Sequence, residues 1–189
     1  MATGVRRPPA RRRNRGCDRA LSKPASQRAH DFLEGTLADV TPAQFTWDPP
    51  GKAFSIGANY AHVLGAEDMA IQGLLQGRSL LAASAWAGKV GASEPPPLGP
   101  GVDVKGWSQR AKLDLVGMRR YGQAVYAATD EYLGSIRPEE LSRPIDLSQF
   151  GLGKQTVLFV LTAILSNASL HTGEISCLKG QQGAKGYPV

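Results

Sequence analysis

Apolar residues recur at helical spacing in four separate stretches of the chain, which predicts four helices. The most regular stretch covers residues 154–179, where the apolar face is almost unbroken over about seven helical turns. The other three stretches cover residues 25–38, 55–76 and 104–136. No segment alternates polar and apolar residues over the length of a strand, apart from a few residues around Ile145. The pattern therefore predicts an all-α protein.

Capping and helix-breaking residues mark the ends of these stretches. Ser55 is a good N-cap for the second helix, and Thr41-Pro42 is typical of a short helical turn before it. Pro138 stops the third helix, and Gly180 ends the fourth. Residues 77–104 are rich in Gly, Pro and Ala and are far longer than a helix–helix turn. We therefore expect a four-helix bundle with one long crossover between its second and third helices.

The net positive charge of the chain comes entirely from its N-terminal segment. Residues 1–28 hold nine of the 22 Lys and Arg residues and one of the 16 acidic residues, which gives this segment a net charge of +8. The rest of the chain has 13 basic and 15 acidic side chains, a net charge of −2. Because residues 1–28 have almost no large apolar side chains, we expect a disordered tail followed by one domain over residues 29–189.

Three functions of this tail stay open at this stage. Its arginines suit contact with nucleic-acid phosphates. Its many arginines and few acidic residues are also typical of a transit peptide, although its prolines disfavour the amphipathic helix that such a peptide forms. The third alternative is a dispensable extension.

Cysteine content and hydropathy indicate the compartment. The chain has two cysteines, Cys17 and Cys177, which cannot form a disulfide framework or a Cys-x-x-Cys metal site. The longest apolar stretch, residues 157–165, is too short to span a bilayer. We therefore expect a cytoplasmic protein without a membrane partner.

Two histidines and an asparagine form the candidate site. His171 lies on the apolar stripe of the last predicted helix, so its side chain should point inward. Asn167 is one turn earlier on the same face, which is the spacing of a His-x-x-x-His metal pair with its first member changed. His62 lies in the middle of the second predicted helix. Imidazoles on facing helices can bind zinc, iron or nickel, whereas an inward histidine can equally be a hydrogen-bonded core residue.

Two carboxylates and one further histidine complete the candidates. Glu67 and Glu174 are expected near the same face, where either would act as a metal ligand, as a hydrogen-bond partner of a histidine or as a solvated charge. His30 falls in the short first helix and is expected at the surface.

Two segments of the sequence resemble the DinB-like superfamily. Residues 54–68 resemble its second helix, in which a histidine is followed by small apolar residues and an acidic pair. Residues 171–180 resemble its final helix, in which the pattern His-x-Gly-Gln/Glu-Ile leads to a glycine, and the closing residues 185–188 are also similar. The resemblance covers roughly residues 29–189.

The resemblance implies a four-helix bundle that holds a divalent metal (Zn, Ni, Mn or Fe) with three histidines. By position, His62 and His171 match two of them, and Asn167 stands where the third is expected. The resemblance implies a thiol-dependent S-transferase or isomerase that uses mycothiol, bacillithiol or glutathione, and the expected reaction joins the thiol to a small-molecule electrophile. In such an enzyme the metal would activate the thiol, and Glu67 or Glu174 would accept its proton.

The departure at Asn167 supports a second hypothesis, because an amide oxygen is a weaker ligand than an imidazole. The chain would then be a non-catalytic bundle that acts as a dimerisation or small-ligand module. A homo-oligomer is expected in either case, since bundles commonly associate through their helices. A third hypothesis is association with nucleic acid through the tail.

Overall fold

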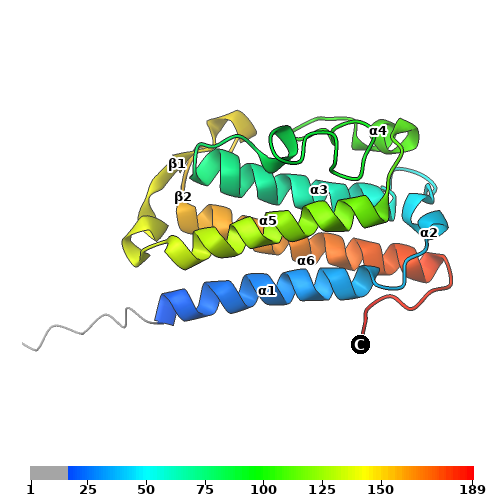
Figure 1. Cartoon of the computed structure of the whole chain (residues 1–189), viewed down its shortest axis with the longest axis horizontal. Coiled ribbons are helices and arrows are strands. Elements are labelled where there is room, and N and C mark those ends of the chain that lie inside the picture. The colour runs from blue at the N-terminus through cyan, green and yellow to red at the C-terminus, as the bar shows by residue number, and fades with distance from the viewer. Residues whose placement is uncertain (1–16) are drawn as a thin grey trace, which may run out of the picture.

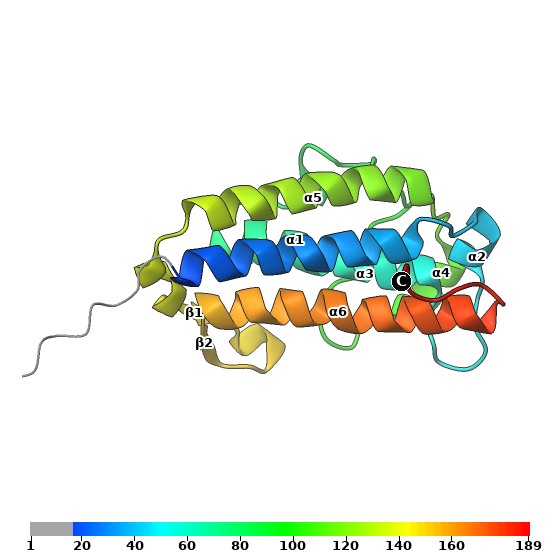
Figure 2. The ribbon, with the colours of Figure 1, turned by 90° about the horizontal axis from the view of Figure 1, so that it is seen from below.

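The chain forms a bundle of four long helices, as the periodicity predicts. The computed structural model describes residues 17–189, with side-chain placement from residue 25 onward. In Figures 1 and 2, helix α1 lies beside α5 and α6, and α3 packs against the same two helices from the other side. The bounds of the long helices are α1 Cys17–Leu37, α3 Ile56–Asp68, α5 Leu115–Ser135 and α6 Val157–Gln181. No helix in the described part of the chain is long and apolar enough to cross a membrane.

Side-chain caps start the helices where the sequence indicates. The Ser55 hydroxyl accepts a hydrogen bond from the backbone N–H of Ala58, which starts α3. Thr41 and Gln44 form a reciprocal capping box at the short helix α2, Pro42–Thr46. Beyond Asp68 the helix continues as a π-helical segment, η1 Met69–Leu75, so the predicted helix over residues 55–76 is confirmed with a change of winding.

The single helix predicted over residues 104–136 is wrong. The structure has a short helix α4, Val104–Arg110, followed by a break and then α5. Asp114 is the N-cap of α5, because its carboxylate accepts hydrogen bonds from the backbone N–H groups of Val116 and Gly117. Next to it, Leu113 pairs with Ala92 of the crossover in an isolated β-bridge. The apolar spacing runs through this break, so periodicity alone does not detect it.

The long crossover is tied to the bundle by one buried carboxylate. Asp68 accepts hydrogen bonds from the backbone N–H groups of Leu81 and Ala82, which begin a 3-10 turn (η2 Leu81–Ala83), and from the Tyr121 hydroxyl of α5. Further along, Gly91 has φ +77°, and a Cβ atom there would collide with the backbone of Met118. The crossover therefore lies directly against α3 and α5, as Figure 1 shows.

The connection between α5 and α6 contains a two-stranded antiparallel sheet, at the position where the sequence suggested extended residues. Strand β1, Pro144–Asp146, pairs with β2, Lys154–Thr156, and Ile145 lies opposite Gln155. Two 3-10 turns flank β1, η3 Pro138–Ser142 and η4 Ser148–Phe150.

The first helix is longer than its apolar residues predict. It begins at Cys17 rather than near Ala25, so it extends into the segment expected to be a tail. Residues 1–16, which carry most of the arginines considered above for nucleic-acid contact or targeting, lie outside the described residues.

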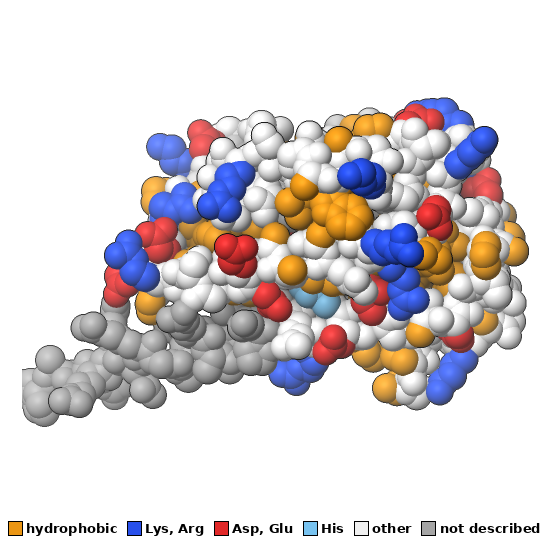
Figure 3. Space-filling view, viewed as in Figure 1, with side chains coloured by type: hydrophobic (Ala, Val, Ile, Leu, Met, Phe, Trp, Pro, Cys, Tyr) orange, Lys and Arg blue, Asp and Glu red, His pale blue; other side chains and the backbone are white. Residues whose placement is uncertain are grey.

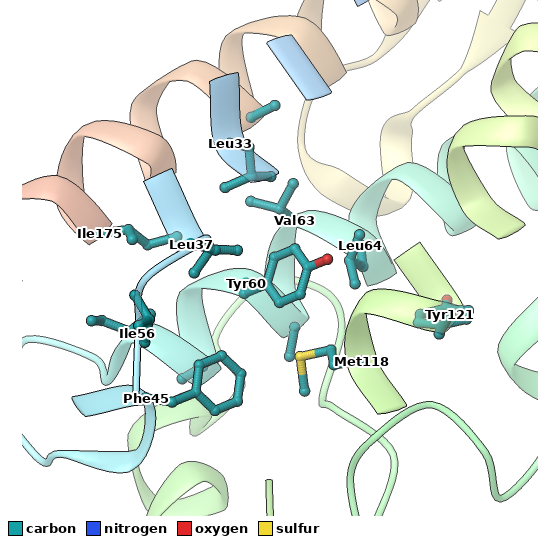
Figure 4. Close-up of a cluster of buried hydrophobic side chains, with 14 of the residues drawn as sticks. Leu33, Leu37, Phe45, Ile56, Tyr60, Val63, Leu64, Met118, Tyr121 and Ile175 are labelled. Atoms are coloured by element: carbon teal, nitrogen blue, oxygen red, sulfur yellow. The ribbon is translucent and has the colours of Figure 1, made fainter. Parts of the chain in front are cut away.

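The core fills the space between the four helices. Figure 4 shows Leu33 and Leu37 of α1, Tyr60 of α3 and Ile175 of α6 pointing toward one another. At one end of the bundle, the Lys179 side chain is 2% exposed, and its Nζ donates to the carbonyl oxygen of Thr36 and to the Asp39 carboxylate. This contact joins the end of α6 to the end of α1.

Candidate functional site

His62 and His171 meet where α3 packs against α6. Their ring centres are 4.8 Å apart with an interplanar angle of 70°. His171 is only partly exposed, with 17% of its side chain accessible. The structure therefore brings together the two histidines that the sequence placed on separate helices.

Asn167 lies at the same place. It is one turn before His171 on α6, and its side chain is hydrogen-bonded to His62. The three positions that the resemblance implies for metal ligands thus converge, with an amide in one of them.

The Nδ1 atom of His171 lies within hydrogen-bonding distance of two acceptors. Its Nδ1 lies 2.6 Å from Oε2 of Glu174 and 3.1 Å from Oδ1 of Asn59. Asn59 presents its oxygen because its Nδ2 donates to the carbonyl oxygen of Ser55 at 3.2 Å. Both partners of Nδ1 are therefore acceptors, so Nδ1 carries a proton, and in the neutral ring Nε2 is the nitrogen with the lone pair.

Asn59 is the site residue that the sequence reasoning did not identify. It lies three residues before His62 on α3, which places the two side chains on one face of that helix. That spacing was the only feature of the sequence that could have indicated Asn59 as a site residue.

Glu67 does not lie with His62. Five residues separate them on α3, which is about 140° around a helix, whereas three or four would have placed them on one face. Glu67 is instead 3% exposed and contacts the Nε2 atom of His30 at 3.0 Å and the hydroxyl of Thr129 at 2.5 Å. Of the two candidate carboxylates, only Glu174 lies at the histidine pair.

His30 is buried, and the expectation of a surface position is wrong. It is 8% exposed, and its ring stacks on Tyr126 with centres 3.9 Å apart. His30 lies three residues before Leu33 and seven before Leu37, which is the spacing of the buried face of α1, and this face turns it toward Glu67 of α3 and Tyr126 of α5.

The surroundings of His62 favour its neutral form. Burial lowers the pKa of the imidazole, and the nearby charge of His171 lowers it further. The hydrogen bond to Asn167 and the carboxylate of Glu174 act in the opposite direction. A neutral imidazole keeps a lone pair for a ligand at neutral pH.

This shift predicts a pH dependence of stability. Because the folded-state pKa of His62 lies below the unfolded value of about 6.5, its stabilising contribution is complete above that pH and is lost as the pH falls through the folded pKa. We expect the metal-free protein to lose more free energy of unfolding between about pH 7.5 and pH 5 than the His62→Gln variant does. Urea unfolding at both pH values measures this difference, and equal losses in the two proteins would contradict it.

The residues present fit a divalent cation through two imidazoles and one amide oxygen. Two imidazoles that bind one tetrahedral zinc through nitrogens about 2.0–2.1 Å from the metal have ring centres roughly 5 Å apart, close to the separation of His62 and His171. A carboxylate on the outer nitrogen, as Glu174 provides to His171, is the usual partner of a metal-binding histidine. Within the described residues, no group of three or more His, Cys, Asp or Glu side chains is placed to hold a metal ion. Asn167 is thus the weakest of the three candidate metal ligands.

Comparison with known proteins identifies relatives by family and by fold. The family model described as the DinB superfamily matches residues 26–175, a range that includes His62, Asn167 and His171. Among solved structures, a conserved protein from Enterococcus faecalis superposes with a TM-score of 0.72 at 24% sequence identity, over 85% of this chain and 94% of that one. No curated protein matches the chain.

Proposed function

The chain belongs to the DinB superfamily, and on that premise we propose that it binds a divalent metal ion through His62 and His171 and transfers a low-molecular-weight thiol to a small electrophile. The convergence of His62, Asn167 and His171 at one point between α3 and α6 carries the proposal. When bound, a divalent metal would lower the pKa of the thiol, so that the reactive thiolate forms near neutral pH.

The residues around the pair have separate tasks in this proposal. His62, kept neutral by burial, offers a lone pair. Glu174 and Asn59 hold a proton of His171 on Nδ1, so that in the neutral ring Nε2 offers the lone pair. Glu174 is also 56% exposed, and in this proposal its carboxylate accepts the proton of an incoming thiol. Glu67 has no part in this step, because it is bonded to His30 and Thr129.

Metal content tests the proposal directly. We expect the untagged full-length protein, grown with Zn, Ni, Mn and Fe in the medium, to retain metal, and His171→Ala to lose it. Mass spectrometry of the purified protein measures this. His30→Gln is the control, because it removes an imidazole outside the site and should leave the metal content unchanged. Equal metal content in His171→Ala and the wild-type protein would refute the site.

A dimerisation module is the second candidate function, and the exposed face of α6 favours it. No charged residue occurs between Lys154 and Glu174, although seven residues between Val157 and His171 are exposed. They are Leu158, Phe159, Thr162, Ala163, Ser166, Ser169 and Leu170. By contrast, Lys, Arg, Asp and Glu side chains are interspersed over the face seen in Figure 3. An uncharged helical face can meet its own copy around a two-fold axis without repulsion between like charges.

A substitution on this face tests the dimer. Leu170 is 70% exposed, and we expect Leu170→Lys to place two like charges near the two-fold axis and shift the protein toward monomer. Light scattering after size-exclusion chromatography measures the mass. Val116→Lys is the control, since Val116 is 60% exposed on α5, away from this face. A wild-type protein that is monomeric at high concentration would rule the proposal out.

A further inference from the structure

A second polar group lies inside the bundle, away from the histidine pair. A cavity of about 20 Å³ lies between α1, α3, α5 and α6. Its polar side is formed by Ser26, His30, Glu67 and Thr129, and its remaining wall is aliphatic, with Leu133, Leu161 and Ile164 among its members. Neither His62 nor His171 borders it.

The Glu67 carboxylate has unused capacity to accept hydrogen bonds. Its contacts are the Thr129 hydroxyl, 2.5 Å from Oε1, and His30 Nε2, which lies 3.0 Å from each oxygen. A carboxylate offers about four acceptor positions, so these two donors leave room for a third. Because Glu67 itself borders the cavity, a group placed there can donate to it.

The charge of the cavity selects the ligand. Among the side chains that the structure describes, from residue 25 onward, no Lys or Arg borders it, and Arg119 is paired with Glu34, 2.9 Å from Nε to Oε2. Glu67 would repel an anion, whereas a cation would meet a carboxylate that is 3% exposed.

The shape limits the size of the polar group. A space of about 20 Å³ takes one group of the size of a water molecule, which is also the size of an ammonium. Ala29, Ile164 and Leu165 border the cavity and are half-buried, so an attached chain can leave between α1 and α6 along apolar side chains.

We infer that this cavity binds a short, unbranched primary alkylamine, with its ammonium group donating to Glu67 and its alkyl chain lying against Leu161 and Ile164. This binding site is separate from the one proposed for the metal. An alcohol of the same length fills the same space without the charge, so the difference in affinity between amine and alcohol isolates the carboxylate.

Titration of the full-length protein with butylamine and with butanol at constant ionic strength tests the inference. Methyl resonances of selectively labelled Leu and Ile residues report binding at Leu133, Leu161 and Ile164. Since hydrogen bonds to charged groups are the strong ones, we expect butylamine to bind at least about tenfold more tightly than butanol. Glu67→Gln should remove that advantage.

Two further variants test the binding site even if Glu67→Gln folds poorly. Ile164→Phe fills the mouth of the cavity and should abolish binding, whereas Leu158→Phe, on the exposed face of the same helix, should leave binding unchanged. His171→Ala should also bind butylamine normally, because the amine does not need the metal site. Equal affinities for amine and alcohol, an amine preference that survives Glu67→Gln, or occupation by water alone would overturn the inference.

Discussion

Replacing Asn167 by histidine should tighten divalent-metal binding by a large factor. The substitution places a third imidazole at the point where His62 and His171 already meet. Outer-shell partners of metal ligands are worth about 10- to 100-fold in affinity, so an added ligand should contribute at least about 100-fold. Calorimetric titration of the metal-free proteins with zinc and nickel measures the change.

Ser166→His is the matched control for this prediction. Ser166 is exposed and lies next to Asn167 on α6, about 100° around the helix, so its histidine would face solvent. Its affinity should stay near that of the wild-type protein. If Asn167→His binds metal no better than Ser166→His does, the three positions do not form a common ligand set, and the dimerisation function becomes the preferred one.

Replacing Glu67 by leucine should cause a large loss of stability without any effect on metal content. The change leaves the buried His30 ring and the Thr129 hydroxyl without their common acceptor. A buried hydrogen-bonding group left without its partner costs about 1–3 kcal/mol, which is a large part of the stability of a small domain. Chemical denaturation gives the free energy of unfolding.

A double variant separates pairing from packing at this position. Replacing His30 by leucine together with Glu67 removes both polar partners, and apolar replacement of a whole buried pair is often neutral, so much of the loss should be recovered. Glu131→Leu, on the exposed surface of α5, is the control and should change stability by no more than about 0.5 kcal/mol. A Glu67→Leu variant as stable as Glu131→Leu would mean that the contacts of Glu67 with His30 and Thr129 contribute little to stability.

The same glutamate shows where sequence reasoning failed. Glu67 follows His62 closely in the chain, and closeness in sequence suggested a shared site. A spacing of five residues turns the two side chains to different faces of α3, and the partner of Glu67 is His30, 37 residues away. That contact depends on how α1 lies against α3 and α5, which no local pattern encodes.

Relations within one helix were predictable because helical geometry fixes them. The spacing of Asn167, His171 and Glu174 placed them on one face of α6, and Ser55 marked the start of α3. The number of helices followed from the apolar period, and the resemblance of residues 54–68 and 171–180 indicated that His62 would face His171.

Relations between helices were decided only by the tertiary structure. The pairing of His30 with Glu67, the role of Asn59 and the cavity beside Glu67 all arise where side chains from different helices meet. The break before α5 arises because the Asp114 cap and the bridge between Leu113 and Ala92 replace helical hydrogen bonds. Local sequence therefore sets which side chains share a face of each helix, through the period of 3.6 residues per turn. Close packing then determined which faces meet, since contacts distant in sequence depend on how all four helices fit together at once.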